Sequence, residues 1–186
     1  ENFYNCIIHN YNRENFPDVP YTQSLTDSQL QSIKILDCSY VIKDDNERIK
    51  SIKGLERLTN LTDLTLSNSM LTTIDVSSNP KLTTLSAWDN PLTNIDVSNN
   101  PELTKLDVRN NQLTSLDISK NTKLTQLLVD YNQLTSLDVS NNTALTYLKA
   151  SENELTSLDV SKNTALTALW IDYNQLTSLD LSGATA

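Results

Sequence analysis

Leucine recurs along the last two-thirds of the chain at a fixed interval of 21 residues, at Leu71, Leu92, Leu113, Leu134, Leu155 and Leu176. Each unit contains the pattern LxxLxxxxNxL, as in Leu145, Leu148, Asn153 and Leu155. Apolar and polar residues alternate in the middle of this pattern, which is the period of a β-strand. One short strand cannot bury its apolar face alone, whereas stacked copies can. The pattern therefore predicts parallel strands in one sheet, near residues 62–67, 84–88, 105–109, 126–130, 147–151 and 168–172.

The rest of each unit sets the shape of the stack. After the strand and its turns, about ten residues remain for the return path, too few for a full α-helix. Short 3₁₀ or extended segments are therefore expected on the convex side. These features are typical of a right-handed leucine-rich-repeat solenoid, with its parallel β-sheet on the concave face.

Asparagine follows the predicted strand in nearly every unit, at Asn90, Asn111, Asn132, Asn153 and Asn174, with Ser69 one unit earlier. Such a side chain lies inside the turn, where its amide can satisfy backbone groups of its own and the adjacent coil. Because the same residue recurs in every unit, a framework role is favoured over a catalytic one. Asn110, beside this column but facing outward, is expected to tolerate alanine.

Aspartate forms a second column within the motif LDVSxN, at Asp75, Asp96, Asp117, Asp138, Asp159 and Asp180. Two interpretations are open. Each carboxylate can accept hydrogen bonds from backbone N–H groups about two residues ahead, as in an Asx turn, or the ladder can share calcium ions. We favour the turns and predict no metal site or cofactor. On this interpretation, chelator leaves the melting temperature unchanged.

Residues 1–32 lack the period and are expected to form a short α-helical N-terminal cap. Phe3, Cys6 or Ile7, and Tyr11 lie at helical spacing. Thr26 and Gln29 form the signature of a capping box that leads into a second helix containing Leu30 and Ile33. Pro17 and Pro20 fit the loop between the two helices. A solenoid needs such an end piece because its first strand would otherwise expose an edge of the core.

The repeat array is expected over residues 33–186, irregular in 33–70 and regular from Leu71. Ile33, Leu36 and Cys38 take the inward positions of the first strand. Cys38 can therefore replace a buried aliphatic side chain as a free thiol, or it can form a disulfide with Cys6 of the cap. His9 is the only histidine, and a single histidine without partners does not indicate a metal site or a general base. The last unit breaks off part-way, so we expect a longer parent protein.

The composition excludes several classes of function. The net charge is −9, with 23 acidic and 14 basic residues, which is the opposite of what a nucleic-acid-binding protein needs to neutralise phosphates. No run of 18 apolar residues exists, so membrane insertion is not expected. A repeat stack without isolated, tuned carboxylates is a binding scaffold and not an enzyme, and we expect a monomer.

The sequence resembles bacterial internalins. The matching residues are Leu30 to Ile33 and, in IKSIKGLERLTNL, Ile49, Ile52, Gly54, Leu55 and Leu58. The units LTSLDVSxNTxLTxL resemble the internalin-J-like branch. That resemblance implies a bacterial protein of the cell surface, wall-anchored or secreted, with further C-terminal domains. One departure is that the inward column, where this branch often carries cysteine, here reads Leu66, Ala87, Val108, Val129, Ala150 and Ile171.

Side chains that vary between units should mark a binding surface, since the framework positions barely change. They are the outward positions on the concave face and include both tryptophans and three of the seven tyrosines. Clustered aromatic residues are typical of interface hot spots. The predicted site comprises Trp88, Asp89, Lys105, Asp107, Arg109, Gln126, Leu128, Asp130, Tyr131, Tyr147, Lys149, Glu152, Trp170, Asp172 and Tyr173.

Three functions remain open for this surface. It can recognise a host or matrix protein through aromatic anchors within a charged rim, as in adhesion, which we favour. It can bind a glycan, with aromatic rings stacking on sugars and polar side chains contacting hydroxyls. Alternatively, the chain is a structural spacer of a cell-wall protein, and its concave side chains have no role.

Overall fold

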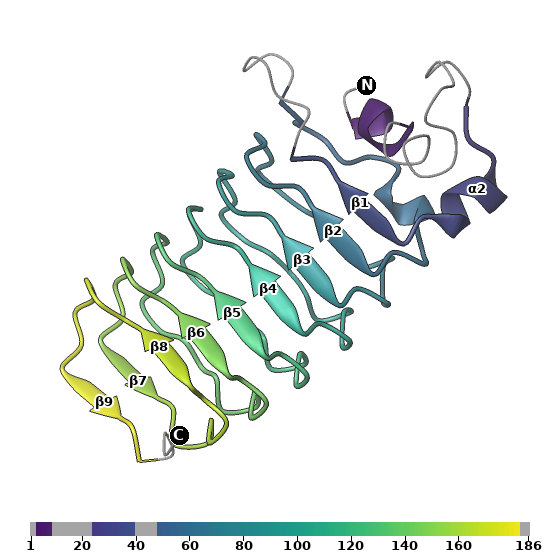
Figure 1. The fold of residues 1–186 in the computed structure, drawn as a ribbon. Helices are drawn as coiled ribbons and strands as arrows, with labels where there is room; N and C mark the ends of the chain where they lie inside the picture. The colour runs from purple at the N-terminus through teal and green to yellow at the C-terminus, as the bar shows by residue number, and fades with distance from the viewer. Residues whose placement is uncertain (1–2, 9–23, 40–47, 183–186) are drawn as a thin grey trace.

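Seven short parallel strands form one sheet in the computed structural model, which describes residues 3–8, 24–39 and 48–182 (Figure 1). In the order of the sheet they are β1 (Ile35–Asp37), β2 (Asp63–Thr65), β3 (Thr84–Ser86), β4 (Lys105–Asp107), β5 (Gln126–Leu128), β6 (Tyr147–Lys149) and β8 (Ala168–Trp170). The predicted leucine-rich-repeat solenoid is confirmed, although each strand is only three residues long.

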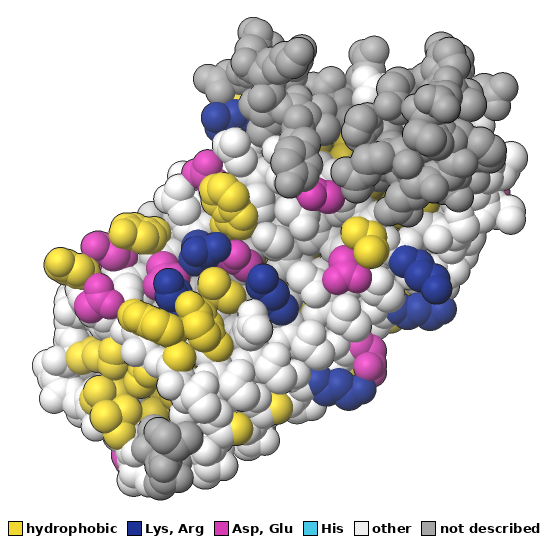
Figure 2. Space-filling model, in the orientation of Figure 1, with side chains coloured by type: hydrophobic (Ala, Val, Ile, Leu, Met, Phe, Trp, Pro, Cys, Tyr) yellow, Lys and Arg dark blue, Asp and Glu magenta, His cyan; other side chains and the backbone are white. Residues whose placement is uncertain are grey.

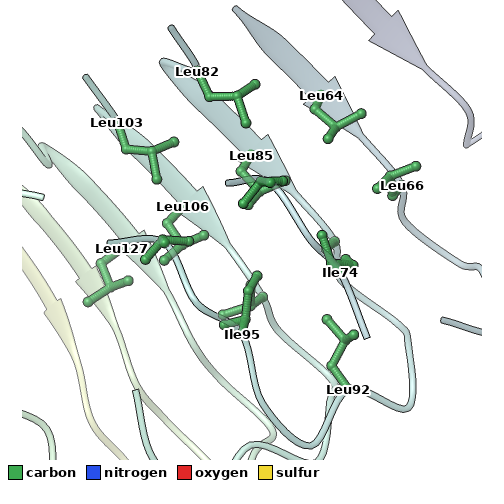
Figure 3. Close-up of a cluster of buried hydrophobic side chains, with 14 of the residues drawn as sticks. Leu64, Leu66, Ile74, Leu82, Leu85, Leu92, Ile95, Leu103, Leu106 and Leu127 are labelled. Atoms are coloured by element: carbon green, nitrogen blue, oxygen red, sulfur yellow. The ribbon is translucent and has the colours of Figure 1, made fainter. Parts of the chain in front are cut away.

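The register of the sheet follows the sequence period. Leu64 pairs with Leu85, and each following pair is again 21 residues apart, up to Leu148 and Leu169. Between β1 and β2 the offset is 28 residues, from Leu36 to Leu64, so the first repeat is the irregular one. These leucines point inward in rows together with Ile74 and Ile95 of the convex side, forming a continuous core through the stack (Figure 3).

In the described residues the convex side consists largely of turns, bends and coil without an α-helix, in agreement with the short return path. One 3₁₀ helix, η1 (Leu55–Arg57), begins after Gly54, whose φ of 108° lies where glycine is favoured. Toward the C-terminus, β7 (Ser157–Asp159) and β9 (Ser178–Asp180) form a second, two-stranded parallel sheet. The repeat pattern did not predict this second sheet.

The aspartate column lies on this convex side and forms the expected Asx turns. Each carboxylate accepts a hydrogen bond from the backbone N–H of the serine two residues ahead, as from Ser119 to Asp117 at 2.9 Å. Hydrogen bonds from the serine hydroxyl and backbone lower the pKa of every one of these six carboxyl groups. Within the described residues, no three Asp, Glu, His or Cys side chains gather as metal ligands would; the calcium test remains a prediction.

The N-terminal segment covers the first strand with two helices. Residues 3–8 are helical, and α2 (Asp27–Ser32) begins at Thr26 with the predicted reciprocal capping box to Gln29. Leu30 and Ile33 are buried. Tyr11, His9 and the two loop prolines lie outside the described residues. None of the helices in the described part of the chain is long and apolar enough to cross a membrane.

A disulfide joins Cys6 of the first helix to Cys38 at the end of β1. Both cysteines are fully buried, so Cys38 does occupy the inward position of a buried aliphatic residue, but not as a free thiol. The sequence spacing did not decide between a free Cys38 thiol and a Cys6–Cys38 disulfide, because the cap has no repeat period that fixes its distance from β1.

Two ladders of buried asparagine connect successive repeats. In the first, Nδ2 of Asn90 donates to the carbonyls of Leu66 and Ala87 at 3.0 and 3.1 Å, and Oδ1 accepts from the N–H of Leu71 at 3.1 Å. Asn111, Asn132, Asn153 and Asn174 repeat this arrangement. The predicted role in satisfying backbone groups of two adjacent coils is confirmed.

The second asparagine ladder was not predicted. It runs through the last residue of the LDVSxN motif, where Nδ2 of Asn100 donates to the carbonyls of Val76 and Asn79 at 3.0 and 2.9 Å. Its members are all fully buried: Asn79, Asn100, Asn121, Asn142 and Asn163. Their recurrence in every unit was the signal that identifies them.

Reducing the disulfide should destabilise the cap. The bond spans 32 residues, and closing a loop of this length stabilises by roughly 3–4 kcal/mol in the chain-entropy description. We expect dithiothreitol, or the Cys6→Ala, Cys38→Ala double exchange, to lower the free energy of unfolding by about this amount in denaturant titrations. Equal stability of the oxidised and reduced chains would contradict the bond.

Asn132→Ala should destabilise by about 1–3 kcal/mol, because it leaves buried backbone groups without partners. Asn141→Ala is the matched control, since Asn141 is exposed and lies next to the buried Asn142; it should change stability by less than about 0.5 kcal/mol. Urea midpoints of the two variants measure the difference, and equal losses at both positions would refute the framework role.

Candidate binding surface on the concave face

A hollow of about 610 Å³ opens on the concave face, at the C-terminal ends of the strands. Its lining comes from five successive repeats and comprises Trp88, Arg109, Asn110, Asp130, Tyr131, Lys149, Ser151, Glu152, Trp170, Asp172 and Tyr173. Figure 2 shows hydrophobic, basic and acidic side chains gathered on one part of the molecular face. Pockets of this size are typical of ligand sites, though this one is open to solvent.

The parallel register brings these distant residues together. Trp88, Arg109, Asp130, Ser151 and Asp172 are 21 residues apart and occupy the same position in successive repeats. Neighbouring strands in a sheet lie about 5 Å apart. Hydrogen bonds between adjacent rows confirm this proximity, for example from the N–H of Ser151 to Oδ1 of Asp130 at 3.1 Å.

The next position in each repeat has a left-handed backbone, with φ between 52° and 60° at Asn68, Asp89, Asn110, Tyr131, Glu152 and Tyr173. Asparagine and aspartate tolerate this conformation, whereas other side chains with a Cβ occupy it at a cost of roughly 1–2 kcal/mol. The first three repeats carry the tolerant residues. The last three carry two tyrosines and a glutamate, and all three line the hollow.

These left-handed positions also correct one expectation. Asn110 was expected to tolerate alanine, but its φ of 52° makes alanine unfavourable there. Its Nδ2 also donates to Oδ1 of Asp89 at 2.6 Å. An outward-facing side chain is therefore not sufficient for tolerance when the backbone itself is selective.

The two cations of the hollow are held in different ways. The Arg109 guanidinium donates two hydrogen bonds to the Asp107 carboxylate, at 2.8 and 2.7 Å, which raises the pKa of Arg109. Lys149 instead places Nζ 5.0 Å from the ring centre of Trp170, an arrangement in which the ring face attracts the cation. Tyr147, on the same strand β6 as Lys149, also contacts the Trp170 ring, with the two ring centroids 4.7 Å apart.

The carboxylates of the hollow are only partly satisfied by the protein. Asp130 is buried, with 6% of its surface exposed, and this burial raises the pKa of its carboxyl group. Asp172 accepts one hydrogen bond at Oδ1, from the hydroxyl of Ser151 at 2.5 Å. The Glu152 carboxylate accepts none from the described part of the chain.

Nine of the fifteen residues predicted for the site line the hollow; the six that do not are Asp89, Lys105, Asp107, Gln126, Leu128 and Tyr147. Asp107 and Leu128 were expected to face outward, but both are buried. Asp107 lies beneath Arg109.

Asn110 and Ser151 line the hollow and were not in the predicted site. Both occupy varying positions of the repeat, so within-chain variation was the signal that would have included them.

One protein family matches the chain: the leucine-rich-repeat domain of the endo-β-N-acetylglucosaminidase EndoS, over residues 30–142. This match covers more than half of the sequence. The chain belongs to this family of leucine-rich-repeat domains. None of the curated protein sequences compared with the chain matches it.

Solved structures show the same fold in bacterial repeat proteins. The functional domain of InlJ from Listeria monocytogenes, which includes a cysteine ladder, is 29% identical with a TM-score of 0.57, over 97% of this chain and 47% of that one. An internalin, InlF, from the same species is 25% identical with a TM-score of 0.73, over 96% and 61%. A Leptospira interrogans repeat protein is 24% identical with a TM-score of 0.73, over 86% and 43%.

These likenesses agree with the internalin-like character of the repeats. The chain spans between 43% and 61% of the lengths of these three structures. The cysteine ladder of InlJ has no counterpart in the inward column here, where Leu66, Ala87, Val108, Val129 and Ala150 are buried.

Tyr131→Asn should stabilise the protein, by about 0.5–1 kcal/mol, because asparagine fits the left-handed backbone better than tyrosine. Tyr131 is 58% exposed as a residue, so little packing is lost. Tyr131→Phe is the matched control and should leave the free energy of unfolding unchanged, since it keeps the strained backbone. A loss of stability in Tyr131→Asn would contradict the strain at this position.

Asp130→Asn should raise the melting temperature at neutral pH. Burial raises the pKa of Asp130 in the folded protein, so its stabilising protonated form is lost as the pH rises through the folded pKa. The gain from asparagine should therefore vanish when the pH falls below about 3.9, the unfolded value.

Asp117→Asn is the control of opposite sign. Hydrogen bonds from Ser119 lower the pKa of Asp117, so its stabilising charged form is present above the unfolded pKa and is lost in acid. This variant should be less stable than the wild type at neutral pH, with a gap that closes as the pH falls below about 3.9. The same pH dependence in both variants would be inconsistent with these assignments.

Proposed function

We propose that this chain is a non-enzymatic recognition module that binds a protein partner through the hollow on its concave face. The observation that carries the proposal is the coincidence of strain and exposure at Tyr131 and Tyr173. Both occupy left-handed backbone that disfavours tyrosine, and 58% and 74% of their surfaces face solvent. Strained residues of this kind cluster where function retains them.

The surrounding residues suit a protein interface. Tryptophan, tyrosine and arginine are the residues most often found as binding anchors, and the hollow contains Trp88, Trp170 and Arg109 besides its two tyrosines. Arg109 is held by Asp107 and Trp170 by Tyr147, so their side chains are ordered before a partner arrives. Such pre-organisation lowers the entropy lost on binding.

A glycan is the second candidate ligand. Two observations favour it: the hollow combines exposed aromatic rings with polar groups of both signs, and the matching family is named after an endo-β-N-acetylglucosaminidase, an enzyme whose name refers to a glycan. A neutral glycan would bind with little dependence on salt, whereas a charged protein surface would bind less tightly at high ionic strength.

We place the protein outside the cell, at a bacterial surface or in secreted form. The buried Cys6–Cys38 disulfide supports this location, because such bonds persist in oxidising compartments and are rare in the cytosol. The likeness to Listeria internalins agrees with a bacterial source. Fractionation of cells that express the parent gene, with the disulfide state tested by thiol labelling, would contradict the placement if the protein were cytosolic and reduced.

Replacing Trp88, Tyr147 and Trp170 with alanine should abolish high-affinity binding of the partner, because anchors of this kind lose about 2 kcal/mol or more on truncation. The partner is sought with the immobilised chain on host-surface and matrix proteins, beside a glycan array. Its affinity for the wild type and for the single and triple variants is then measured by calorimetry, after circular dichroism has shown that the variants fold.

The matched control replaces Thr114, Thr135 and Ser136, which are exposed on the convex side, and should leave the affinity unchanged. Unchanged affinity in the aromatic triple variant would move the site to the convex face or to the cap. If only glycans bind, the second candidate is correct. If no ligand appears in either screen, the chain is a spacer.

A further inference from the structure

We infer that the C-terminal half of the hollow receives an arginine side chain of the protein partner, between the aromatic rings of Tyr131, Trp170 and Tyr173 and the carboxylates of Asp130, Glu152 and Asp172. This inference rests on the proposed function and names the chemistry of the partner.

The strained residues lie in this half alone. The left-handed positions of the first repeats carry Asn68, Asp89 and Asn110, which tolerate the backbone, whereas Tyr131, Glu152 and Tyr173 do not. Two of these three residues offer ring faces and the third offers a carboxylate. Exchanging any of the three for asparagine would relieve strain. A ligand that contacts both aromatic rings and a carboxylate would explain why all three are retained.

The charges of this half do not balance. Arg109 is neutralised by its two hydrogen bonds to Asp107. Lys149 is the remaining cation of the lining, against the carboxylates of Asp130, Glu152 and Asp172. Among the described residues, none of these three carboxylates has a cation within 4.0 Å; the ion pairs found there lie elsewhere.

The hydrogen-bonding capacity of the carboxylates points the same way. Oδ1 of Asp130 accepts a hydrogen bond from the N–H of Ser151, and Oδ1 of Asp172 accepts one from the Ser151 hydroxyl. Oδ2 of Asp172 and both oxygens of Glu152 accept nothing from the described residues. A guanidinium presents five N–H donors in a plane, can pair with a carboxylate through two parallel bonds, and stacks on aromatic faces.

The protein itself contains an example of the contact. Lys149 lies with its ammonium 5.0 Å from the ring centre of Trp170, so this ring already holds a cation on one face. The rings of Tyr131 and Tyr173 are exposed. The overall charge of −9 would also attract a basic partner at long range. An arginine from the partner therefore meets aromatic surface and negative charge together.

The test uses tryptophan fluorescence, because both tryptophans of the chain, Trp88 and Trp170, line the hollow. Trp88→Phe leaves Trp170 as the reporter. The probe is the peptide acetyl-Gly-Arg-Gly-amide, and its citrulline counterpart is the uncharged control of nearly equal shape. We expect the arginine peptide to change the emission of Trp170 saturably, with a dissociation constant at least about tenfold lower than that of the citrulline peptide.

The double variant Glu152→Gln, Asp172→Asn should bind the arginine peptide about tenfold or more weakly. The double variant Asp138→Asn, Asp159→Asn makes the same charge change on the convex side and should alter the affinity less than about twofold. Equal binding of both peptides, equal losses in the two double variants, or no emission change would overturn the inference. A response to N,N′-diacetylchitobiose without one to arginine would overturn it in favour of a glycan.

These outcomes are separable from failure of the proposed function. If the arginine peptide does not bind but the partner protein still requires Trp88, Tyr147 and Trp170, the concave hollow remains the binding site and the arginine inference alone is wrong. If the aromatic triple variant binds its protein partner unchanged, the proposed site itself is wrong.

Discussion

The structure depends on satisfying the backbone inside a stack of very short strands. Three-residue strands leave most of each coil without sheet partners, yet the coil turns are buried between neighbours. Two asparagines per repeat help to resolve this problem. The Asn90 amide donates to a carbonyl of its own repeat and one of the repeat before it, whereas the Asn100 amide donates to two carbonyls of the preceding repeat. Any change of repeat length would move these side chains away from their partners, so the ladders fix the 21-residue period.

That constraint determines where the sequence is free to vary. The inward leucines and both asparagine columns are nearly constant, whereas the columns that contain Trp88 and Tyr131 change from repeat to repeat. Because the register is fixed, residues 21 positions apart become neighbours on one rigid surface. The framework therefore presents a variable set of side chains without itself moving, which is the property that a recognition surface needs.

The sequence alone was sufficient for the fold because its signals repeat. The leucine period predicted the parallel sheet, and Thr26 with Gln29 predicted the start of α2. What it could not predict arises from single events or from the backbone. The Cys6–Cys38 bond joins a segment without a period to the first strand, and the burial of Asp107 depends on the guanidinium folded over it.

The candidate site was only partly predictable for the same reason. Alternation along the strands located the concave columns, and variation within them identified the aromatic residues. Tyr131, Glu152 and Tyr173 do not themselves signal the left-handed backbone that they occupy. The signal lies in earlier repeats, where the same position carries Asn68, Asp89 and Asn110. This backbone conformation follows from the turn that every repeat makes after its strand. It distinguishes surface residues that cost no stability from those that are retained at a cost in stability.

The most direct test of this account is to exchange Tyr131, Glu152 and Tyr173 together for asparagine and to measure both the free energy of unfolding and partner affinity. If function retains these residues against backbone strain, the triple variant should be more stable by about 1–3 kcal/mol and should bind its partner at least about tenfold more weakly. A triple variant that is less stable than the wild type, or that binds equally well, would contradict the account.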